Sequence, residues 1–386
     1  MGIEIQIQEG PLPHKYRVAI IGAGMICNAA HLPALTPLRK RGAVEVVAVA
    51  DIRPEAARET AQRYEIPAWY DDPQKMLDEV KPDWVSVCTP NRRHNLSILA
   101  LRAGANVMCE KPLALTWREA KEMFDVARQE GKLLFPCQSR RWSPDMDFAS
   151  DVVRKGLLGK PYFADLSFVR RYGIPTWGMF HMKSENGGGP FCDLGVHFLD
   201  SLLWMTGNPR VVSVSGSMYD IIAQKGEDVL LSIKESGAAG GLFTPRPYDP
   251  SEFSVEDSAM GSMRMEGGLS VNFKFTWAMH QPTAKHITIC GDRGGLDVEQ
   301  MVLYQNVGGY QGETKLKYFD NRPFAGVPFD AHHYMYEHVL NVLDGKEEPR
   351  VKPEETLNVV SAIEAFYRSA EENREIRTED LEGYTI

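Results

Sequence analysis

The chain has 386 residues, enough for roughly two or three domains, and its 43% hydrophobic and 25% charged content is typical of globular proteins. A net charge of −9 with no compensating basic run argues against nucleic acid or an anionic membrane as the main partner. No apolar run reaches about 18 residues, and the acidic N-terminus MGIEIQIQEG does not resemble a signal peptide, so we expect a cytoplasmic protein without a membrane segment.

Six cysteines are scattered along the chain without a CxxC pair. This spacing is typical neither of a zinc site nor of a disulfide framework, and it favours reduced thiols in the cytoplasm. We therefore expect small buried side chains and no bound metal. The six are Cys27, Cys88, Cys109, Cys137, Cys192 and Cys290.

The first third of the chain alternates apolar runs with helical patterns. The runs are bounded by turn residues and predict strands, whereas the intervening segments have helical spacing, including a capping box of Thr116 with Glu119. Strands that are apolar throughout and separated by helices predict a parallel, doubly wound sheet. The predicted strands are 16–25, 44–51, 83–90, 106–112 and 132–136, and the predicted helices are 54–64, 94–104 and 116–131.

Doubly wound sheets bind ligands where their strands end. Gly22 and Gly24 end the first strand in GAGMIC, where a tight turn brings backbone amides to a pyrophosphate; small Cys27 replaces the third glycine of this fingerprint. Asp51 ends the second strand, where its carboxylate would accept from a ribose 2′-hydroxyl and repel a 2′-phosphate. The sequence therefore favours NAD over NADP, although Arg53 could reach such a phosphate or stack on adenine.

The next two strand ends also carry polar residues. Residues 89–91 (Thr89, Pro90, Asn91) predict a polar turn over the path of the cofactor, and His94 begins the next helix. Lys111 ends the fourth strand at the mouth of the crevice. The following proline allows a cis peptide, which would fix where the ammonium points.

Beyond Arg141 the pattern changes to runs of strands with few helices between them. This predicts a separate domain with a mostly antiparallel sheet. We divide the chain into an N-terminal arm (1–14), an NAD-binding domain (15–137) and a domain for substrate and oligomerisation (138–386). We assign no firm secondary structure to segment 222–257. The predicted strands are 162–172, 210–219, 262–279, 286–299 and 301–307, and the predicted helices are 147–161, 332–345 and 355–373.

Residues 187–200 read GGGPFCDLGVHFLD. If 193–206 is helical, Asp193 and His197 are four apart and share one face. The simplest interpretation is that Asp193 caps a helix and His197 is a half-buried imidazole. The alternative is that the glycines are flexible and let the backbone approach the nicotinamide, with both side chains facing Lys111.

The chain resembles the glucose–fructose oxidoreductase / inositol dehydrogenase (Gfo/Idh/MocA) family. The resemblance rests on GAGMI (22–26), Asp51, TPNRRH (89–94), EKP (110–112), RRWSP (140–144), GGGPFCDLGVH (187–197) and the closing segment 341–376. It implies a nucleotide domain followed by an α+β domain with a large open sheet, and homodimers or homotetramers packed through that sheet, whose uncovered face we expect to be apolar. It also implies oxidation of a secondary hydroxyl of a sugar, glycoside or cyclic polyol.

The chemistry of the three candidate catalytic residues agrees with the roles that the family assigns. His197, with an ordinary pKa near neutral pH, would take the hydroxyl proton, Lys111 would stabilise the alkoxide-like charge, and Asp193 would orient the substrate. Tyr172 and Trp177 are further substrate-binding candidates. The alternative is a non-catalytic NAD or sugar sensor on the same fold. The expected cofactor-binding residues are Gly22, Gly24, Met25, Ile26, Asp51, Arg53, Thr89, Pro90, Asn91, His94, Glu110, Lys111, Gln138 and Arg141.

Overall fold

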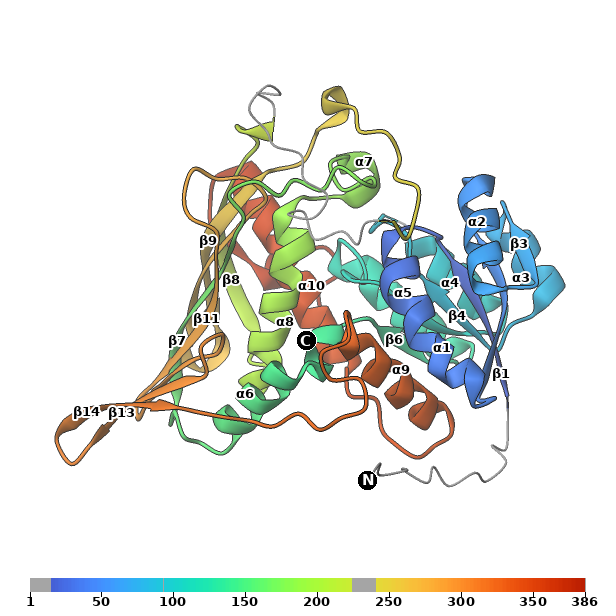
Figure 1. Ribbon diagram of the computed structural model, residues 1–386. Helices are drawn as coiled ribbons and strands as arrows, with labels where there is room; N and C mark the ends of the chain where they lie inside the picture. Colours follow the sequence, from blue (N-terminus) through green and yellow to red (C-terminus); the bar gives the residue numbers. More distant parts are fainter. Residues whose placement is uncertain (1–14, 93, 224–240, 386) are drawn as a thin grey trace, which may run out of the picture.

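The computed structural model describes residues 15–92, 94–223 and 241–385, which form two sheets with helices between and around them (Figure 1). The predicted arm 1–14 and residues 224–240 of the unassigned segment lie outside the described residues. No helix in the described ranges is long and apolar enough to cross a membrane.

The first sheet is parallel, and its six strands have the order β3-β2-β1-β4-β5-β6. All five predicted strands are confirmed. The sequence missed β3, because three residues with mixed burial are too short to show a pattern. The strands are β1 (Tyr16–Ile21), β2 (Val44–Ala50), β3 (Ala68–Tyr70), β4 (Trp84–Val87), β5 (Asn106–Cys109) and β6 (Leu134–Pro136).

Helices cover this sheet on both faces. The three predicted helices form, and the capping box of Thr116 and Glu119 is present at the start of α5. Two helices were not predicted. A π-helical turn, Cys27–His31, leads from the glycine turn into the first of them. The helices are α1 (Leu32–Lys40), α2 (Pro54–Tyr64), α3 (Pro73–Val80), α4 (His94–Arg102) and α5 (Trp117–Gln129).

The second sheet has nine strands in the order β14-β13-β12-β11-β7-β10-β9-β8-β15. Among these pairings only that of β7 with β10 is parallel, so the described sheet is mixed and mostly antiparallel, as predicted. The strands are β7 (Pro161–Val169), β8 (Val211–Tyr219), β9 (Ser258–Met265), β10 (Ser270–Thr276), β11 (Ala284–Gly291), β12 (Gly295–Asp297), β13 (Val302–Val307), β14 (Tyr310–Lys315) and β15 (Ile376–Arg377).

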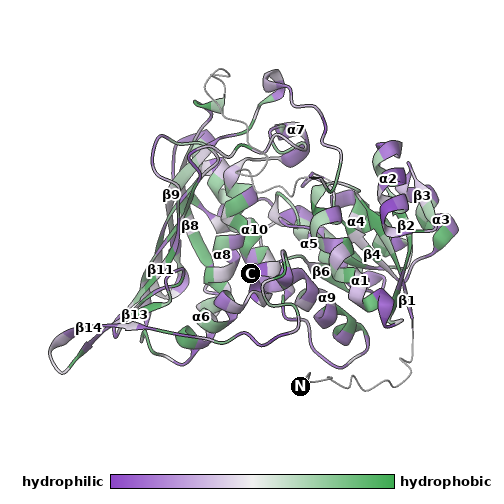
Figure 2. Ribbon diagram, in the orientation of Figure 1, coloured by the Kyte–Doolittle hydropathy of each residue, from purple (hydrophilic) through white to green (hydrophobic). Residues whose placement is uncertain are grey.

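Helices lie on one face of this sheet, between it and the first sheet (Figure 1). They are α6 (Pro144–Arg154), the short α7 (Lys183–Asn186), α8 (Val196–Met205) and α10 (Pro353–Glu372). Apolar residues are prominent on α8 and on the strands beside it (Figure 2). The β13–β14 hairpin projects away from the body.

The opposite face of the second sheet is mostly polar, which corrects our expectation of a broad apolar face. On β10, Val271, Phe273 and Phe275 are buried in the core, whereas the alternating Ser270 and Asn272 are exposed. Strand alternation sends every second side chain outward, and here most of the outward series is polar. Its other members on the central strands include Ser213, Ser215, Ser217, Ser262, Arg264, Lys274 and Thr288.

Helix α9 (Asp330–Leu343) returns to the first sheet, although it follows strands β7 to β14 of the second sheet in sequence. Its Met335 and Leu340 pack in the core with Val18 and Leu35, and Tyr336 stacks on Trp84 with ring centroids 5.2 Å apart. The C-terminal part of the chain therefore packs into the core beside the first sheet.

Candidate active site

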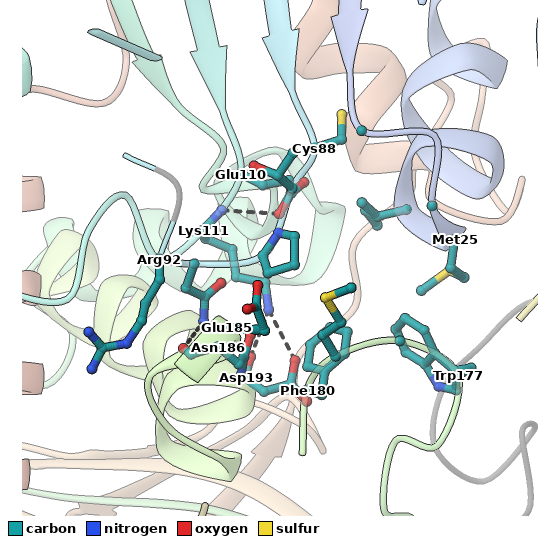
Figure 3. Close-up of a pocket in the computed structure, with 18 of the residues that line it drawn as sticks. Met25, Cys88, Arg92, Glu110, Lys111, Trp177, Phe180, Glu185, Asn186 and Asp193 are labelled. Atoms are coloured by element: carbon teal, nitrogen blue, oxygen red, sulfur yellow. Dashed lines mark hydrogen bonds and ion pairs between the residues drawn. The ribbon is translucent and has the colours of Figure 1, made fainter. Parts of the chain in front are cut away.

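A cavity of about 1000 Å³ lies between the two sheets. The carboxyl ends of β1, β2, β4 and β5 form one wall, as expected for a doubly wound sheet, and the segments around α7 and α8 form the other (Figure 3). Most residues predicted from sequence line it. They are Gly22, Gly24, Met25, Ile26, Asp51, Arg53, Thr89, Pro90, Asn91, His94, Glu110, Lys111, Trp177, Asp193 and His197.

Three predicted residues do not line the cavity. Arg141 is fully buried and donates to both carboxylate oxygens of Asp200, at 2.9 and 2.6 Å. The neighbouring Arg140 faces the cavity instead, because Ser139–Trp142 form a 3₁₀ turn, which points successive side chains about 120° apart. Gln138 is buried, and Tyr172 makes an isolated β-bridge with Ala278 away from the cavity.

The glycine turn after β1 is shaped to accept a dinucleotide. Gly22 has a φ of +99°, and a Cβ there would lie 2.8 Å from the carbonyl of Cys88, so only glycine fits. A Cβ on Gly24 would meet nothing within 4 Å, which leaves open space above the turn. Cys27 is fully buried at the position of the third glycine.

Asp51 is held firmly at the edge of this turn. Its carboxylate accepts from the amide of Ala23 at 2.8 Å and from the amide of Arg53 at 2.9 Å. The Arg53 side chain lies 3.7 Å from the same carboxylate and also reaches the carbonyl of Thr244 at 3.5 Å. The Arg53 guanidinium is thus turned partly toward Asp51 and partly toward the segment 241–257.

Lys111 and Asp193 join the two halves of the cavity. The Lys111 ammonium donates to the Asp193 carboxylate at 3.1 Å and to its main-chain carbonyl at 2.9 Å, and the Lys111–Pro112 peptide is cis. The second Asp193 oxygen accepts from the indole of Trp277 at 3.0 Å. Burial acts to raise the pKa of Asp193, but the charges of Lys111 and Arg170 outweigh it and lower the pKa.

His197 lies in the first turn of α8 and lines the same cavity. Its buried Nδ1 has no hydrogen-bond partner among the described residues. Burial, followed by the positive charges of Lys111 and Arg140, holds the pKa of His197 well below its usual value. This corrects the expectation of a pKa near neutrality. The neutral imidazole is therefore the predominant form of His197 at physiological pH.

The two domains match known families. Residues 16–137 match an oxidoreductase family model with an NAD-binding Rossmann fold, and residues 147–297 match a GFO/IDH/MocA C-terminal domain. The chain belongs to the Gfo/Idh/MocA family of oxidoreductases. It is 34% identical to the D-glucoside 3-dehydrogenase of Escherichia coli, over 92% of this chain and 95% of that protein, and 24% identical to the D-apiose dehydrogenase of Paraburkholderia graminis, over 96% and 91%.

Solved structures share the fold of this Gfo/Idh/MocA chain. A levoglucosan dehydrogenase in complex with NADH and levoglucosan aligns with a TM-score of 0.77 at 18% identity, covering 95% of this chain and 100% of that one. An oxidoreductase domain protein from Kribbella flavida aligns with a TM-score of 0.75 at 21% identity, covering 94% and 99%.

The glycines of the Gfo/Idh/MocA stretch 187–200 do not form a flexible hinge. A Cβ on Gly188 would lie 2.0 Å from the hydroxyl of Tyr367, and one on Gly189 would lie 2.0 Å from the carbonyl of Glu256. These glycines therefore allow close packing of this stretch against other segments of the same domain. Asp193 does not cap α8 either, because it lies inside a π-helical turn, Phe191–Gly195, with its carboxylate directed to Lys111.

Glu256 is a buried residue that sequence reasoning missed. Its carboxylate accepts from the amide of Gly189 at 2.9 Å and from the hydroxyl of Tyr367 at 2.7 Å, so it holds the backbone just before Asp193. Burial raises the pKa of Glu256 to about 7, against the lowering effect of these hydrogen bonds. No local pattern marks this residue, because its partners lie far away in sequence.

The sequence also missed part of the cavity wall. Arg170 lines it from the end of β7, and Phe243 lines it from the segment that received no structure. Trp177 lies on the Met25 side of the cavity, and Phe180 lies between Trp177 and Asp193 (Figure 3), with the two aromatic rings 4.7 Å apart. Arg140 was within reach of sequence analysis, since it belongs to the RRWSP motif.

Proposed function

We propose that this chain oxidises a secondary hydroxyl of a sugar, glycoside or cyclic polyol to the ketone, with NAD as the preferred cofactor. The observation that carries the proposal is the buried contact of Lys111 with Asp193, beside His197, in a cavity that begins at the Gly22 turn. A cation, a neutral imidazole and a carboxylate beside a dinucleotide turn are the groups that alcohol oxidation needs.

Each residue has a distinct task in this reaction. Bound NAD supplies the hydride acceptor, and the turn at Gly22–Gly24 with Asp51 would hold its pyrophosphate and ribose. Lys111 holds the substrate oxygen and stabilises the negative charge that grows on it. His197, neutral because its pKa is depressed, accepts the hydroxyl proton, while Asp193 accepts a hydrogen bond from the substrate and fixes Lys111.

The substrate class follows from the relatives and from the cavity. The relatives are a D-glucoside 3-dehydrogenase and a D-apiose dehydrogenase, which favours catalysis over a sensor function. Flat aromatic faces beside charged groups suit a sugar ring, and Trp177 with Phe180 supply such faces. We also propose a cytoplasmic homodimer or homotetramer that uses the uncovered face of the second sheet.

A panel of glucosides, free sugars and inositols, each incubated with NAD and with NADP, tests the function. We expect reduced-nicotinamide absorbance with NAD and at least one member of the panel. The matched control is His197→Ala, which should bind NAD and produce a signal roughly a hundredfold smaller or less. NAD binding without turnover of any member, together with tight sugar binding, would instead identify a sensor.

A further inference from the structure

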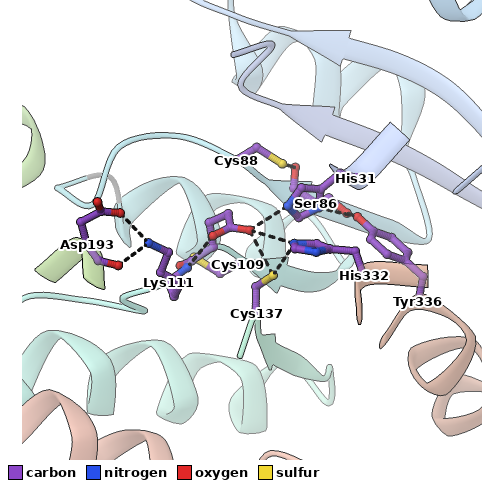
Figure 4. A network of polar contacts seen from close by, with 10 residues as sticks. His31, Ser86, Cys88, Cys109, Lys111, Cys137, Asp193, His332 and Tyr336 are labelled. Carbon is purple, nitrogen blue, oxygen red and sulfur yellow. Dashed lines mark hydrogen bonds and ion pairs between the residues drawn. The ribbon is translucent and has the colours of Figure 1, made fainter. Parts of the chain in front are cut away.

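Four potential metal ligands converge at the base of the cavity. The side chains of His31, Glu110, Cys137 and His332 each offer one ligand atom, and these four atoms all lie within 4.8 Å of one another. They come from four separate segments: the turn before α1, the ends of β5 and β6, and α9. His31, Cys137 and His332 point toward one another around a carboxylate, which is that of Glu110 (Figure 4).

The geometry points to a divalent metal site with zinc as the preferred ion, beyond the dehydrogenase function proposed above. Two nitrogens, a sulfur and an oxygen are ligands that zinc accepts, and tetrahedral ligands around zinc are roughly 3.3–3.7 Å apart. The His332 Nε2 atom is 3.8 Å from both the Cys137 Sγ and a Glu110 oxygen. The same oxygen is 2.9 Å from His31 Nε2 and 3.1 Å from Cys137 Sγ, so those pairs need only about half an ångström of expansion.

Surrounding hydrogen bonds orient the ligands as metal sites require. His31 Nδ1 lies 2.7 Å from the hydroxyl of Tyr336, which is 2.9 Å from the hydroxyl of Ser86, so Nε2 is the nitrogen directed into the cluster. The other oxygen of Glu110 accepts from the amide of Lys111 at 3.1 Å. Such partners fix the orientation of imidazole and carboxylate ligands, and they leave one Glu110 oxygen for the ion.

Charge and access also suit zinc. A thiolate from Cys137 and the carboxylate of Glu110 balance a divalent cation, while His31 and His332 bind as neutral imidazoles. The cluster is closed to bulk solvent, since His31 and His332 are 0% and 5% exposed. Glu110 and His332 nevertheless line the cavity, which provides the route by which an ion enters.

The site is structural rather than catalytic. Four protein ligands complete a tetrahedral shell and leave no position for substrate, as in structural zinc sites. The ion would clamp α9 against the ends of β5 and β6, directly before Lys111 in sequence. Because the ion would not contact the substrate, metal binding can be tested separately from the proposed dehydrogenase activity.

Zinc content and cobalt spectroscopy test the site without using activity. After dialysis, the full-length protein should retain about one zinc per chain, and Co²⁺ in its place should give a thiolate-to-cobalt band in the near ultraviolet. Cys137→Ser should lose that band, and His332→Gln should bind the ion roughly 10–100-fold more weakly or worse. The matched controls are Cys290→Ser and His286→Gln on β11, which should behave as the wild type.

Thermal unfolding with added Zn²⁺ or a chelator gives a second readout that needs no variant to be fully stable. After removal of bound metal with the chelator, added zinc should raise the Tm of the wild-type protein and of Cys290→Ser, but not that of Cys137→Ser. Three results would overturn the site: substoichiometric zinc with no cobalt–thiolate band in the wild type, a band that survives in Cys137→Ser, or a Tm of the chelator-treated wild type that zinc leaves unchanged. In those cases the cluster is a metal-free hydrogen-bond network centred on Glu110.

Discussion

The ammonium of Lys111 donates at once to the carboxylate and to the main-chain carbonyl of Asp193, two contacts of 3.1 and 2.9 Å between residues 82 apart in sequence. This pair connects the end of β5 in the first sheet to the turn before α8 in the second domain. The relative placement of the two domains therefore also sets the geometry of the proposed catalytic residues.

Lys111→Ala should lower kcat by roughly 10²–10³, because it removes a charge that acts mainly in the transition state. The loss of the ammonium should also raise the pKa of Asp193, since Lys111 is one of the charges that lower it. Steady-state kinetics on folded, NAD-binding protein measures the effect. Lys183→Ala is the control, because this lysine pairs with Glu371 at the surface. Near wild-type turnover in Lys111→Ala would remove Lys111 from the mechanism.

His197→Ala should lose roughly a hundredfold or more in kcat, the usual scale for a general base, with NAD affinity nearly unchanged. In the wild type the pKa of His197 is depressed, so the acid limb of the kcat profile should lie below about pH 6.5. Arg140→Met removes one of the charges that depress this pKa, so the acid limb should move to higher pH. A limb that stays in place in Arg140→Met would show that another group titrates.

Asp51→Ala should weaken NAD binding and reduce the difference between the NAD and NADP affinities. The reason is that the carboxylate would accept hydrogen bonds from the ribose hydroxyls of NAD and repel a 2′-phosphate. Intrinsic tryptophan fluorescence reports the Kd of each cofactor. Asp125→Ala on α5, whose carboxylate pairs with Lys121 at 2.6 Å, should leave both affinities unchanged. Tighter binding of NADP by the wild type would show that Arg53 outweighs Asp51.

Glu256 should make stability fall as the pH rises. Its pKa in the folded protein is about 7, above its unfolded value, so between about pH 4.5 and pH 7 the folded state holds a proton that the unfolded state has released. That proton favours folding at low pH, and its contribution is lost as the pH rises through 7. Glu256→Gln should flatten this part of the Tm profile. An unchanged slope in the variant would assign the pH dependence to other groups.

Light scattering at micromolar concentration should report a homodimer or homotetramer. Ser262→Arg on the uncovered face of the second sheet should shift the oligomeric state toward monomer by like-charge repulsion. Because that face is polar, the interface should rely on hydrogen bonds and shape more than on apolar burial. A wild-type protein that remains monomeric across this range would contradict the proposed assembly.

The sequence by itself determined the first sheet and most of its ligand-binding edge. Apolar runs with turn residues at their ends are local signals, and Gly22, Asp51 and Lys111 each end such a run. Spacing and the family resemblance also predicted Asp193 and His197 as site residues without tertiary information, and both line the cavity. Short β3 had too few residues to show a pattern.

The tertiary structure determined the burial, the neighbouring charges and the side-chain directions of those residues. The depressed pKa of His197 comes from burial and from charges of Lys111 and Arg140, which are distant in sequence. Arg141 was misassigned because a 3₁₀ turn directs its side chain into the core toward Asp200. The four-ligand cluster was invisible in sequence for the same physical reason: its members lie on four segments that only packing brings together, and one-dimensional spacing carries no signal of that convergence.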